Sequence, residues 1–444
     1  MSSEWSRVQL GSLIKHKKGF AFKSKDYLDK GIPVIRVSNF TEDSISDKNL
    51  KYVSKEIAAA NGDVELCQDD IVIATVGSWP NNPESVVGRT ICVPSWAKKA
   101  LMNQNSVIIR AKSMSEIDQK FIYYQLKGEK FSQHVISKAQ GSANQASITL
   151  ESIFSYELSW PLEDERKAVV EVLSGFDKRI TLHRQMNVTL EAIAQSLFKS
   201  WFIDFDPVRA KAEGRLAEGI DAKTAALFPD AFEETELGSV PHGWCITTLD
   251  NAYEINPARR LKKGERSAFL DMANVPVRGH HPEVIIYREV GSGSKFINGD
   301  TLLARITPCL QNGKTAYVDF LSDNQVGWGS TEFVVLRPKL PLPLYHGYLL
   351  SRHNPFREFA IKSMSGTSGR QRIQNDVLGR YPVVVPSRNV AEKFGEIVTM
   401  IQQKITENSK QAKVLADLRD TLLPHLISGE LQIPVERVTS EHVK

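Results

Sequence analysis

The sequence predicts an α+β protein made of two tandem mixed domains, each followed by one long helix. Three observations predict this fold: an internal repeat, runs of strand-forming residues in the front part of each repeat, and a heptad pattern in the back part. The chain has 444 residues, which favours more than one domain. Hydrophobic residues make up 41% of it and charged residues 24%, so it can bury hydrophobic cores and is not disordered.

The internal repeat links the two halves of the chain. Residues 141–198 align without a gap with residues 366–423, at a constant shift of 225 residues. Upstream the match is looser, and pairing Trp5 with Trp244 requires a shift of 239 residues, so the front part of the first copy carries extra residues. The period is far too long for a solenoid, and two copies of one large unit are the simpler interpretation.

The front part of each copy has the pattern of a mostly β, mixed domain. Short β-branched and aromatic runs, such as IPVIRVSNF at 32–40 and EFVVLR at 332–337, are separated by turn residues. A proline closes each part, and a helical pattern follows. The predicted segments are two domains at 1–161 and 244–386, two helices at 162–204 and 387–430, a linker at 205–243 and a tail at 431–444.

A heptad seam dominates the back part of each copy. Seam residues recur at alternating steps of four and three from Val169 to Trp201 and from Phe394 to Leu426, which predicts two long coiled-coil helices. At ~1.5 Å per residue each rod would be roughly 48 Å long. Three polar members, His183, Asn187 and Asn408, lie near mid-seam, where buried polar residues can fix the register.

The two helices can pair with each other, because the narrow apolar stripe of each needs a partner. The alternative is that each helix packs only on its own β-rich domain. The residues expected to pair the helices are Phe176, Ile180, Leu190, Leu197, Trp201, Ile401, Ile405, Leu415, Leu422 and Leu426.

Positive charge is concentrated in the two β-rich parts. Residues 1–161 carry 20 basic and 17 acidic residues, and residues 244–386 carry 18 and 12, whereas the rest of the chain is acidic. Such domains attract nucleic acids, because neutralising phosphates releases condensed counterions. The signal is weak by itself, since the net charge of the whole chain is only +4.

Three pairs of loops combine basic residues with glycine, hydroxyl and amide groups, which is typical of contacts with phosphates and base edges. For each loop a solvated turn is the alternative interpretation. DNA contact is favoured for Arg370 and Arg372, which lie beside two glycines. The candidate DNA-binding residues are Lys17, Lys18, Lys23, Ser78, Asn81, Ser142, Asn144, Gln145, Arg259, Arg260, Lys262, Lys263, Lys314, Arg370, Gln371 and Arg372.

Motifs of catalysis and cofactor binding are missing from the sequence. No GxxxxGK[ST] occurs, and Asn354-Pro355-Phe356 lacks the second proline of an adenine methyltransferase motif. The four cysteines are far apart, which excludes a cysteine zinc site and fits a reducing cytoplasm. We predict no catalytic residue and no metal site, and we expect the pair His280-His281 to be solvated. With no signal-peptide core and no long apolar run, a cytoplasmic location is expected.

The chain resembles the specificity subunit of a type I restriction-modification system. The resemblance rests on the repeat, the two helices and four segments, at residues 31–40, 196–209, 236–244 and 418–431. It implies two target recognition domains joined by two antiparallel coiled-coil helices with pseudo-two-fold symmetry. It also implies that partner subunits dock on these helices, through the residues named above for pairing.

The resemblance implies the partners and their cofactors as well. The partners are double-stranded DNA, two modification (methyltransferase) subunits and two restriction (nuclease and translocase) subunits. S-adenosylmethionine, ATP and Mg²⁺ belong to those subunits, and none is expected in this chain. The expected function is non-catalytic recognition of a bipartite, asymmetric DNA target with an unread spacer. The alternatives are a coiled-coil scaffold without a nucleic-acid role and a stand-alone DNA-acting enzyme.

Overall fold

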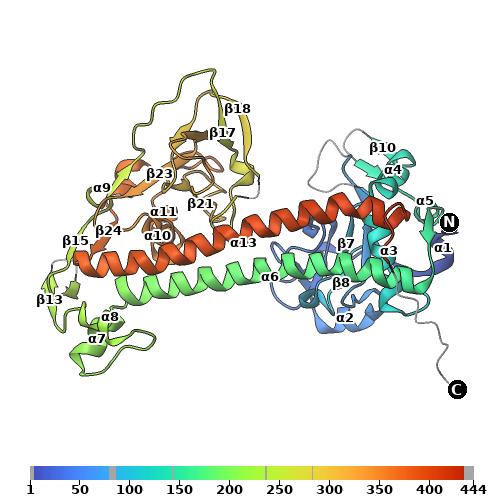
Figure 1. The fold of residues 1–444 in the computed structure, drawn as a ribbon, viewed down its shortest axis with the longest axis horizontal. Coiled ribbons are helices and arrows are strands. Elements are labelled where there is room, and N and C mark those ends of the chain that lie inside the picture. The colour runs from blue at the N-terminus through green and yellow to red at the C-terminus, as the bar shows by residue number, and fades with distance from the viewer. Residues whose placement is uncertain (1–4, 80–86, 143–144, 236–237, 283, 435–444) are drawn as a thin grey trace. The chain divides into compact units, whose positions relative to one another are not determined.

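The computed structural model describes residues 5–79, 87–142, 145–235, 238–282 and 284–434 (Figure 1). They form two compact units, of which unit 1 comprises residues 1–179 and 415–444, and unit 2 comprises residues 180–414. The long helices α6 (Glu163–Phe202) and α13 (Arg388–Ser428) each contribute one part to each unit. Among the described residues, no helix is both long and apolar enough to cross a membrane.

The central sheet of unit 1 is antiparallel and is made of β2 (Ile14–Lys18), β9 (Ser106–Ala111), β5 (Ile71–Ala74) and β7 (Thr90–Cys92), in that order. The inner strand β5 is fully buried, because its apolar side chains meet a core on both faces. The edge strand β2 exposes all its residues after Ile14, and its lysines protect the open edge from further pairing.

Smaller sheets surround this centre. They are the three-stranded sheet of β4 (Lys51–Val53), β3 (Ile32–Ile35) and β8 (Leu101–Met102), the pair of β1 (Ser6–Gln9) with β12 (Glu157–Trp160), and the group of β10 (Gln140–Ser142), β11 (Gln145–Ser147) and β6 (Val76–Gly77). The helices of this part are α1 (Leu10–Leu13), α2 (Lys55–Ala60), α3 (Glu116–Lys127), α4 (Glu129–Ser137) and α5 (Leu150–Phe154).

Unit 2 repeats this topology. Its central sheet is β16 (Tyr253–Ile255), β23 (Phe333–Pro338), β20 (Thr301–Ala304) and β21 (Thr315–Tyr317), and its first strand β15 (Cys245–Thr248) pairs with β24 (Pro382–Val385) just before the long helix. Each unit also has one parallel pair, β3 with β8 in unit 1 and β17 (Arg266–Leu270) with β22 (Gly327–Gly329) in unit 2. The repeat in the sequence is therefore a repeat of strand order.

The units differ most in their front parts. In unit 2, β18 (Ile286–Glu289) pairs with β17 as β4 pairs with β3 in unit 1, and β19 (Ser294–Phe296) adds a fourth strand, giving the order β18-β17-β22-β19. The helices of this part are α9 (Leu249–Ala252), α10 (Tyr345–Arg352), α11 (Asn354–Lys362) and α12 (Asn375–Gly379). The additional strand agrees with the weaker sequence match in these parts.

The segment predicted to be a linker, residues 205–243, is folded. It contains α7 (Asp206–Ala212), α8 (Ala222–Ala226) and the hairpin of β13 (Phe232–Thr235) and β14 (Gly238–Pro241). Phe205 and Phe228 from this segment pack with Trp201 and Trp244 in the apolar core of unit 2. Burial of these aromatic rings stabilises the segment as part of unit 2.

Within each unit, residues of α6 and α13 contact each other along the predicted seam. Every residue named for helix pairing is buried or half-buried. In unit 1, Arg419 of α13 donates a hydrogen bond from Nη1 to Asp177 of α6 at 2.6 Å. In unit 2, Asn408 donates to Asn187 at 2.9 Å, and Asn187 donates to the carbonyl of Ile405 at 3.2 Å, while His183 lies 3.3 Å from Asn408. Further along α6, Trp201 and Phe202 contact Phe394 of α13, so the residue number on α13 falls as the number on α6 rises and the two helices run antiparallel in this unit.

The alternative interpretation, that the helices pack on their own domains, is also partly right. Val169 and Leu173 of α6 belong to the core of unit 1, and Phe198 and Phe202 belong to the core of unit 2. The helix ends are therefore core elements, whereas the pairing of the two helices is clearest around the polar residues Asn187 and Asn408. The apolar stripe of each helix contributes both to helix pairing and to the core of a unit, because it continues beyond the stretch in which the two helices pair.

A buried carboxylate fastens the β-rich part of unit 2 to α13. Asp319 accepts hydrogen bonds from Gln402 Nε2 at 2.8 Å and from Thr406 Oγ1 at 2.5 Å, both on α13. On its other side, His280 Nε2 lies 3.0 Å and His281 Nδ1 lies 3.1 Å from the carboxylate. Burial raises the pKa of Asp319, but the hydrogen bonds from the two histidines outweigh it and hold this pKa well below its ordinary value.

The expectation of a solvated histidine pair is wrong. The side chain of His280 is fully buried. Its two ring nitrogens form hydrogen bonds with Tyr345 and Asp319, each at 3.0 Å. His280, His281 and Asp319 are residue types that hold metal ions, and their ligand atoms lie within 4.8 Å of one another. Since the ring nitrogens of His280 already have partners, we interpret the group as a hydrogen-bonded anchor.

Replacing the anchoring carboxylate should destabilise unit 2. We expect Asp319→Asn to lower the free energy of unfolding by about 1–3 kcal/mol near neutral pH, because an amide nitrogen cannot accept the hydrogen bonds. Urea unfolding followed by circular dichroism measures the change. The exposed Asp323 is the matched control, and Asp323→Asn should have little effect.

The same variant should change the pH dependence of stability. A carboxyl group whose pKa is lower in the folded chain stabilises the fold above its unfolded pKa of about 3.9. This stabilisation is lost as the pH falls from there towards the folded pKa. The difference between wild type and Asp319→Asn should therefore shrink below about pH 4. A difference that stays constant from pH 7 to pH 3 would contradict the assignment.

Candidate nucleic-acid interface

Each unit carries one β-hairpin at the first of the predicted loop pairs. In unit 1, β10 and β11 pair Gln140 with Ser147 and Ser142 with Gln145. In unit 2, Ser365 and Arg372 exchange backbone hydrogen bonds of 3.0 and 2.9 Å. Both members of the second pair lie 225 positions after those of the first, so the shift found in the sequence relates one hairpin to the other.

Glycines allow the tight main-chain geometry of both hairpins. A Cβ atom at Gly141 would lie 2.0 Å from the carbonyl oxygen of Gln145, so only glycine fits there. In unit 2 the turn is closed by a hydrogen bond of 3.0 Å from the amide of Arg370 to the carbonyl of Thr367. Gly369 in this turn has a φ of +78°, which glycine adopts without strain.

Each hairpin pairs with the third predicted loop of its own unit. In unit 1, β11 pairs with β6, and Trp79 donates a hydrogen bond from its indole nitrogen to the carbonyl of Ser142 at 2.8 Å. In unit 2, Ile306 forms a bridge with Arg372, and the amide of Thr307 donates to the carbonyl of Gln371 at 3.0 Å. The structure thus brings the first and third loops together in both units through equivalent main-chain contacts.

A third main-chain segment completes this frame. The amide of Thr75 donates to the carbonyl of Asn105 at 2.8 Å in unit 1, and the amide of Arg305 donates to the carbonyl of Glu332 at 2.9 Å in unit 2. Asn105 and Glu332 come directly before the equivalent strands β9 and β23. The frame is therefore shared, whereas the side chains that it carries differ.

The two arginines of the unit 2 hairpin have different surroundings. Arg372 donates three hydrogen bonds of 2.7 to 3.0 Å to the carboxylate of Glu332. Arg370 is exposed, and its guanidinium bonds to none of the residues that the structure describes. The neighbouring Gln371 is half-buried. One arginine is thus held by the protein and the other is available to a ligand.

In the unit 1 hairpin and its neighbouring loop, the candidates are placed as follows. Ser142 and Gln145 are exposed on the hairpin. Ser78 is buried, with 7% of its surface exposed, which limits its direct contact with a ligand. Asn81 and Asn144 lie outside the described residues.

The second loop pair contains both paired and exposed basic residues. Lys17, on the edge strand β2, forms an ion pair with Asp63, and Arg259 donates to the buried Asp300 at 3.4 Å. The ammonium group of Lys314, from the third pair, donates to the carbonyl of Met272 at 2.6 Å, which is a structural role. The exposed candidates of the second pair are Lys18, Lys23, Arg260, Lys262 and Lys263.

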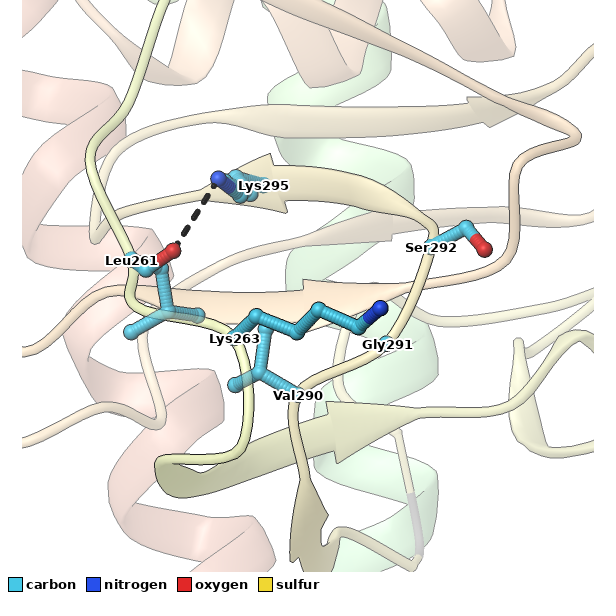
Figure 2. Close-up of a pocket in the computed structure, with 6 residues that line it drawn as sticks. All are labelled: Leu261, Lys263, Val290, Gly291, Ser292 and Lys295. Atoms are coloured by element: carbon cyan, nitrogen blue, oxygen red, sulfur yellow. Dashed lines mark hydrogen bonds between the residues drawn. The ribbon is translucent and has the colours of Figure 1, made fainter.

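A shallow hollow of about 270 Å³ lies beside the second loop in unit 2 (Figure 2). Its lining residues are Leu261, Lys263, Val290, Gly291, Ser292 and Lys295. Figure 2 shows the side chain of Lys263 extending toward the turn at Gly291, and Lys295 donates to the carbonyl of Leu261 at 3.3 Å. These described lining residues include two lysines and a serine but no acidic residue, so the hollow suits a phosphate group.

This hollow is connected to the hairpin frame through the main chain. A second hollow of about 180 Å³ shares Lys295 and is lined by Ser294. Ser294 donates from its hydroxyl to the carbonyl of Phe333 at 3.0 Å, and Phe333 directly follows Glu332. The surface around the hollow and the base of the hairpin are therefore parts of one region of unit 2.

Sequence reasoning missed Glu332 and Lys295. The repeat contained a signal for Glu332, because strands β9 and β23 match in sequence. The residue before each of these strands lies next to the third loop of its unit. No local signal identified Lys295, because its role depends on the turn at residues 291–293 and on the loop that carries Lys263.

The chain matches one family of known proteins. A family model described as "Type I restriction modification DNA specificity domain" matches residues 2–192. The chain is 25% identical over 342 residues to the type I restriction enzyme HindI specificity subunit of Haemophilus influenzae, covering 64% of this chain and 71% of that protein. It is 24% identical over 327 residues to the MjaIX specificity subunit of Methanocaldococcus jannaschii, covering 71% and 69%.

The fold has a counterpart of known structure. The crystal structure of a type I restriction-modification S subunit from M. genitalium matches with a TM-score of 0.53 and 17% identity, covering 95% of this chain and 96% of that one. At this identity the likeness concerns the fold alone. Residues 2–192 match a DNA specificity domain of type I restriction-modification systems, and the chain is similar over about two thirds of its length to specificity subunits of such systems.

Proposed function

We propose that this chain recognises the DNA target of a type I restriction-modification complex, with each unit reading one half of a bipartite sequence. The observation that supports this most strongly is the shared hairpin frame. In both units the ends of the hairpin segment pair through the main chain, Gln140 with Ser147 and Ser365 with Arg372, while the side chains that the two segments present differ. Two equivalent main-chain frames that carry different side chains suit a DNA target whose two halves differ in sequence.

A hairpin of this kind fits the chemistry of DNA recognition. The major groove of B-DNA admits a two-stranded β-ribbon, and its base edges distinguish all four base pairs. Arg370 can donate a bidentate pair of hydrogen bonds to guanine, and Gln145 can pair in the same way with adenine. Arg370 and Gln145 are both exposed on their hairpins.

The lysines around the hollow of unit 2 are assigned to the DNA backbone. Contacts with phosphates fix the register of a protein on DNA, whereas contacts with base edges specify the sequence. Lys263 and Lys295 line a hollow that has no acidic residue among its described lining residues. The recognition domain would then bind phosphates of the duplex at the hollow and contact base edges through the hairpin.

The partner subunits carry out the chemistry in this proposal. The modification and restriction subunits would bind S-adenosylmethionine, ATP and Mg²⁺, and this chain would place them on the target without being catalytic itself. The seam residues are taken up by contacts within the chain, so docking falls on exposed apolar residues of the helices. Leu182 and Val188 of α6 and Met400 of α13 are 55%, 68% and 63% exposed in unit 2.

The proposal predicts a bipartite methylation motif. The chain would be expressed with the modification subunit of its own operon in a host free of other methyltransferases, and methylated adenines would be mapped by single-molecule sequencing. We expect two short specified segments separated by several unspecified base pairs, and no methylation without this chain. A continuous motif, or a motif that persists when this chain is omitted, would contradict the proposal.

The lysines of the hollow should contribute to affinity but not to specificity. In the complex with its modification subunit, Lys263→Ala and Lys295→Ala should each weaken binding to target and non-target duplexes alike. Because a lysine that neutralises one phosphate adds about 1 to the slope of log affinity against log salt, each substitution should reduce the slope by that amount. Fluorescence anisotropy between low and high salt measures both quantities.

An exposed lysine elsewhere in unit 2 provides the control for this measurement. Lys223 lies on α8, and Lys223→Ala removes the same charge at another place. Its salt slope should equal that of the wild type. If the Lys263 and Lys295 variants keep the wild-type slope as well, the assignment of the hollow to phosphate binding is wrong.

A further inference from the structure

The two arginines of the unit 2 hairpin differ in their contacts, and those of Arg372 lie within the protein. Its Nε donates to both carboxylate oxygens of Glu332 at 3.0 and 2.9 Å, and its Nη2 donates to one of them at 2.7 Å. Its remaining nitrogen, Nη1, donates to the backbone carbonyl of Arg370 at 3.2 Å. All three guanidinium nitrogens therefore have a partner within the protein.

This set of contacts connects Glu332 to the main chain of Arg370. Bidentate pairs of arginine and carboxylate are strong and geometrically specific, because two parallel hydrogen bonds fix the plane of the guanidinium. The last contact in the series then restrains the carbonyl of Arg370, at the tip of the hairpin. The orientation of that peptide determines where the side chain of Arg370 can reach.

Glu332 is itself held in place by the frame. Its amide donates a hydrogen bond to the hydroxyl of Ser330 at 3.1 Å. Its carbonyl accepts a hydrogen bond from the amide of Arg305 at 2.9 Å, and the carbonyl of Arg305 in turn accepts one from Ile373, next to Arg372. The carboxylate thus projects from a main-chain position that is fixed relative to the hairpin base.

Unit 1 builds the same frame without an ion pair. Asn105 and Ser147 occupy the positions of Glu332 and Arg372, and the hydroxyl of Ser147 donates to the carbonyl of Gln140 at 3.2 Å instead. Since the pairing of β10 with β11 forms in its absence, a charged pair is not required to build this type of hairpin. The pair of Glu332 and Arg372 must therefore serve something specific to unit 2.

We propose that Glu332 and Arg372 are positioning residues, and that Arg370 is the side chain of unit 2 that determines specificity. This inference rests on the proposed recognition of DNA. The chemistry of a free guanidinium at a hairpin tip matches the O6 and N7 acceptors of guanine in the major groove. Arg372 does not contact the DNA, because its hydrogen bonds are directed to Glu332 and to the hairpin itself.

The test uses the complex of the full chain with its modification subunit, and the target defined by its methylation motif. Binding is measured at one salt concentration for the target duplex and for duplexes with each single base-pair change. Arg370→Ala should lower discrimination by roughly 5- to 150-fold at one base pair, which contains guanine, and leave the other positions unchanged. Arg370→Lys keeps the charge but not the bidentate fork, so it should reduce discrimination equally while preserving more of the non-specific affinity.

Variants of the positioning pair should act through Arg370. Glu332→Gln should reduce discrimination at the same base pair, although it removes a negative charge and so does not weaken non-specific binding. The double variant Glu332→Gln with Arg370→Ala should discriminate no worse than Arg370→Ala alone, because both changes remove one interaction. Thermal unfolding of each variant checks that the complex remains folded.

Two results would overturn the inference. The first would show that Arg372 contacts the DNA and that Glu332 competes with the DNA for it. In that case Glu332→Gln would raise discrimination. Arg372→Ala would remove discrimination at one base pair, and Arg370→Ala would leave discrimination at that base pair unchanged. If Arg370→Ala keeps full discrimination while the wild type is specific, Arg370 is not the reader. A wild-type complex that binds all duplexes equally would instead contradict the proposed function itself, so the two failures are distinguishable.

Discussion

The main-chain pairing at the base of each hairpin is the constraint on which the candidate interface depends. Ser147 pairs with Val76 in unit 1, and Arg372 forms a bridge with Ile306 in unit 2. These hydrogen bonds join backbone groups, so they tolerate changes of side chain at the hairpin tip. The same main-chain frame can therefore carry different base-contacting side chains, which is the property that a family of sequence-recognising proteins requires. This tolerance agrees with the different exposed side chains of the two hairpins, Ser142 and Gln145 in unit 1 and Arg370 in unit 2.

Much of the fold could be predicted from the sequence, because its strongest signals are periodic. The heptad seam requires only that the same helix face meets a partner, and each predicted position is buried or half-buried. Asn187 and Asn408, predicted near the middle of the seam, bond to each other in unit 2. The repeat was equally informative, since one shift of 225 residues relates the paired residues of both hairpins.

The candidate site was predicted less completely, because ion pairing depends on residues that are distant in the sequence. Arg372 looked available as a loop arginine, but its partner Glu332 lies 40 residues before it. Arg259 is held by Asp300, 41 residues away. Local composition identifies basic loops, whereas it cannot show which of their charges are already neutralised. The buried His280 was misjudged for the same reason, since its anchor includes Asp319, which bonds to Thr406 87 residues further on.

The central claim, that each hairpin reads its own half of the target, is tested most directly by mapping methylation motifs for reciprocal hairpin variants. One variant changes only unit 1, with Ser142→Ala and Gln145→Ala, and the other changes the equivalent exposed positions of unit 2, with Thr367→Ala and Arg370→Ala. The account predicts that each variant relaxes the motif in one half, that the two halves differ, and that the spacer stays the same. Relaxation of the same half by both variants, or an unchanged motif in both, would contradict it.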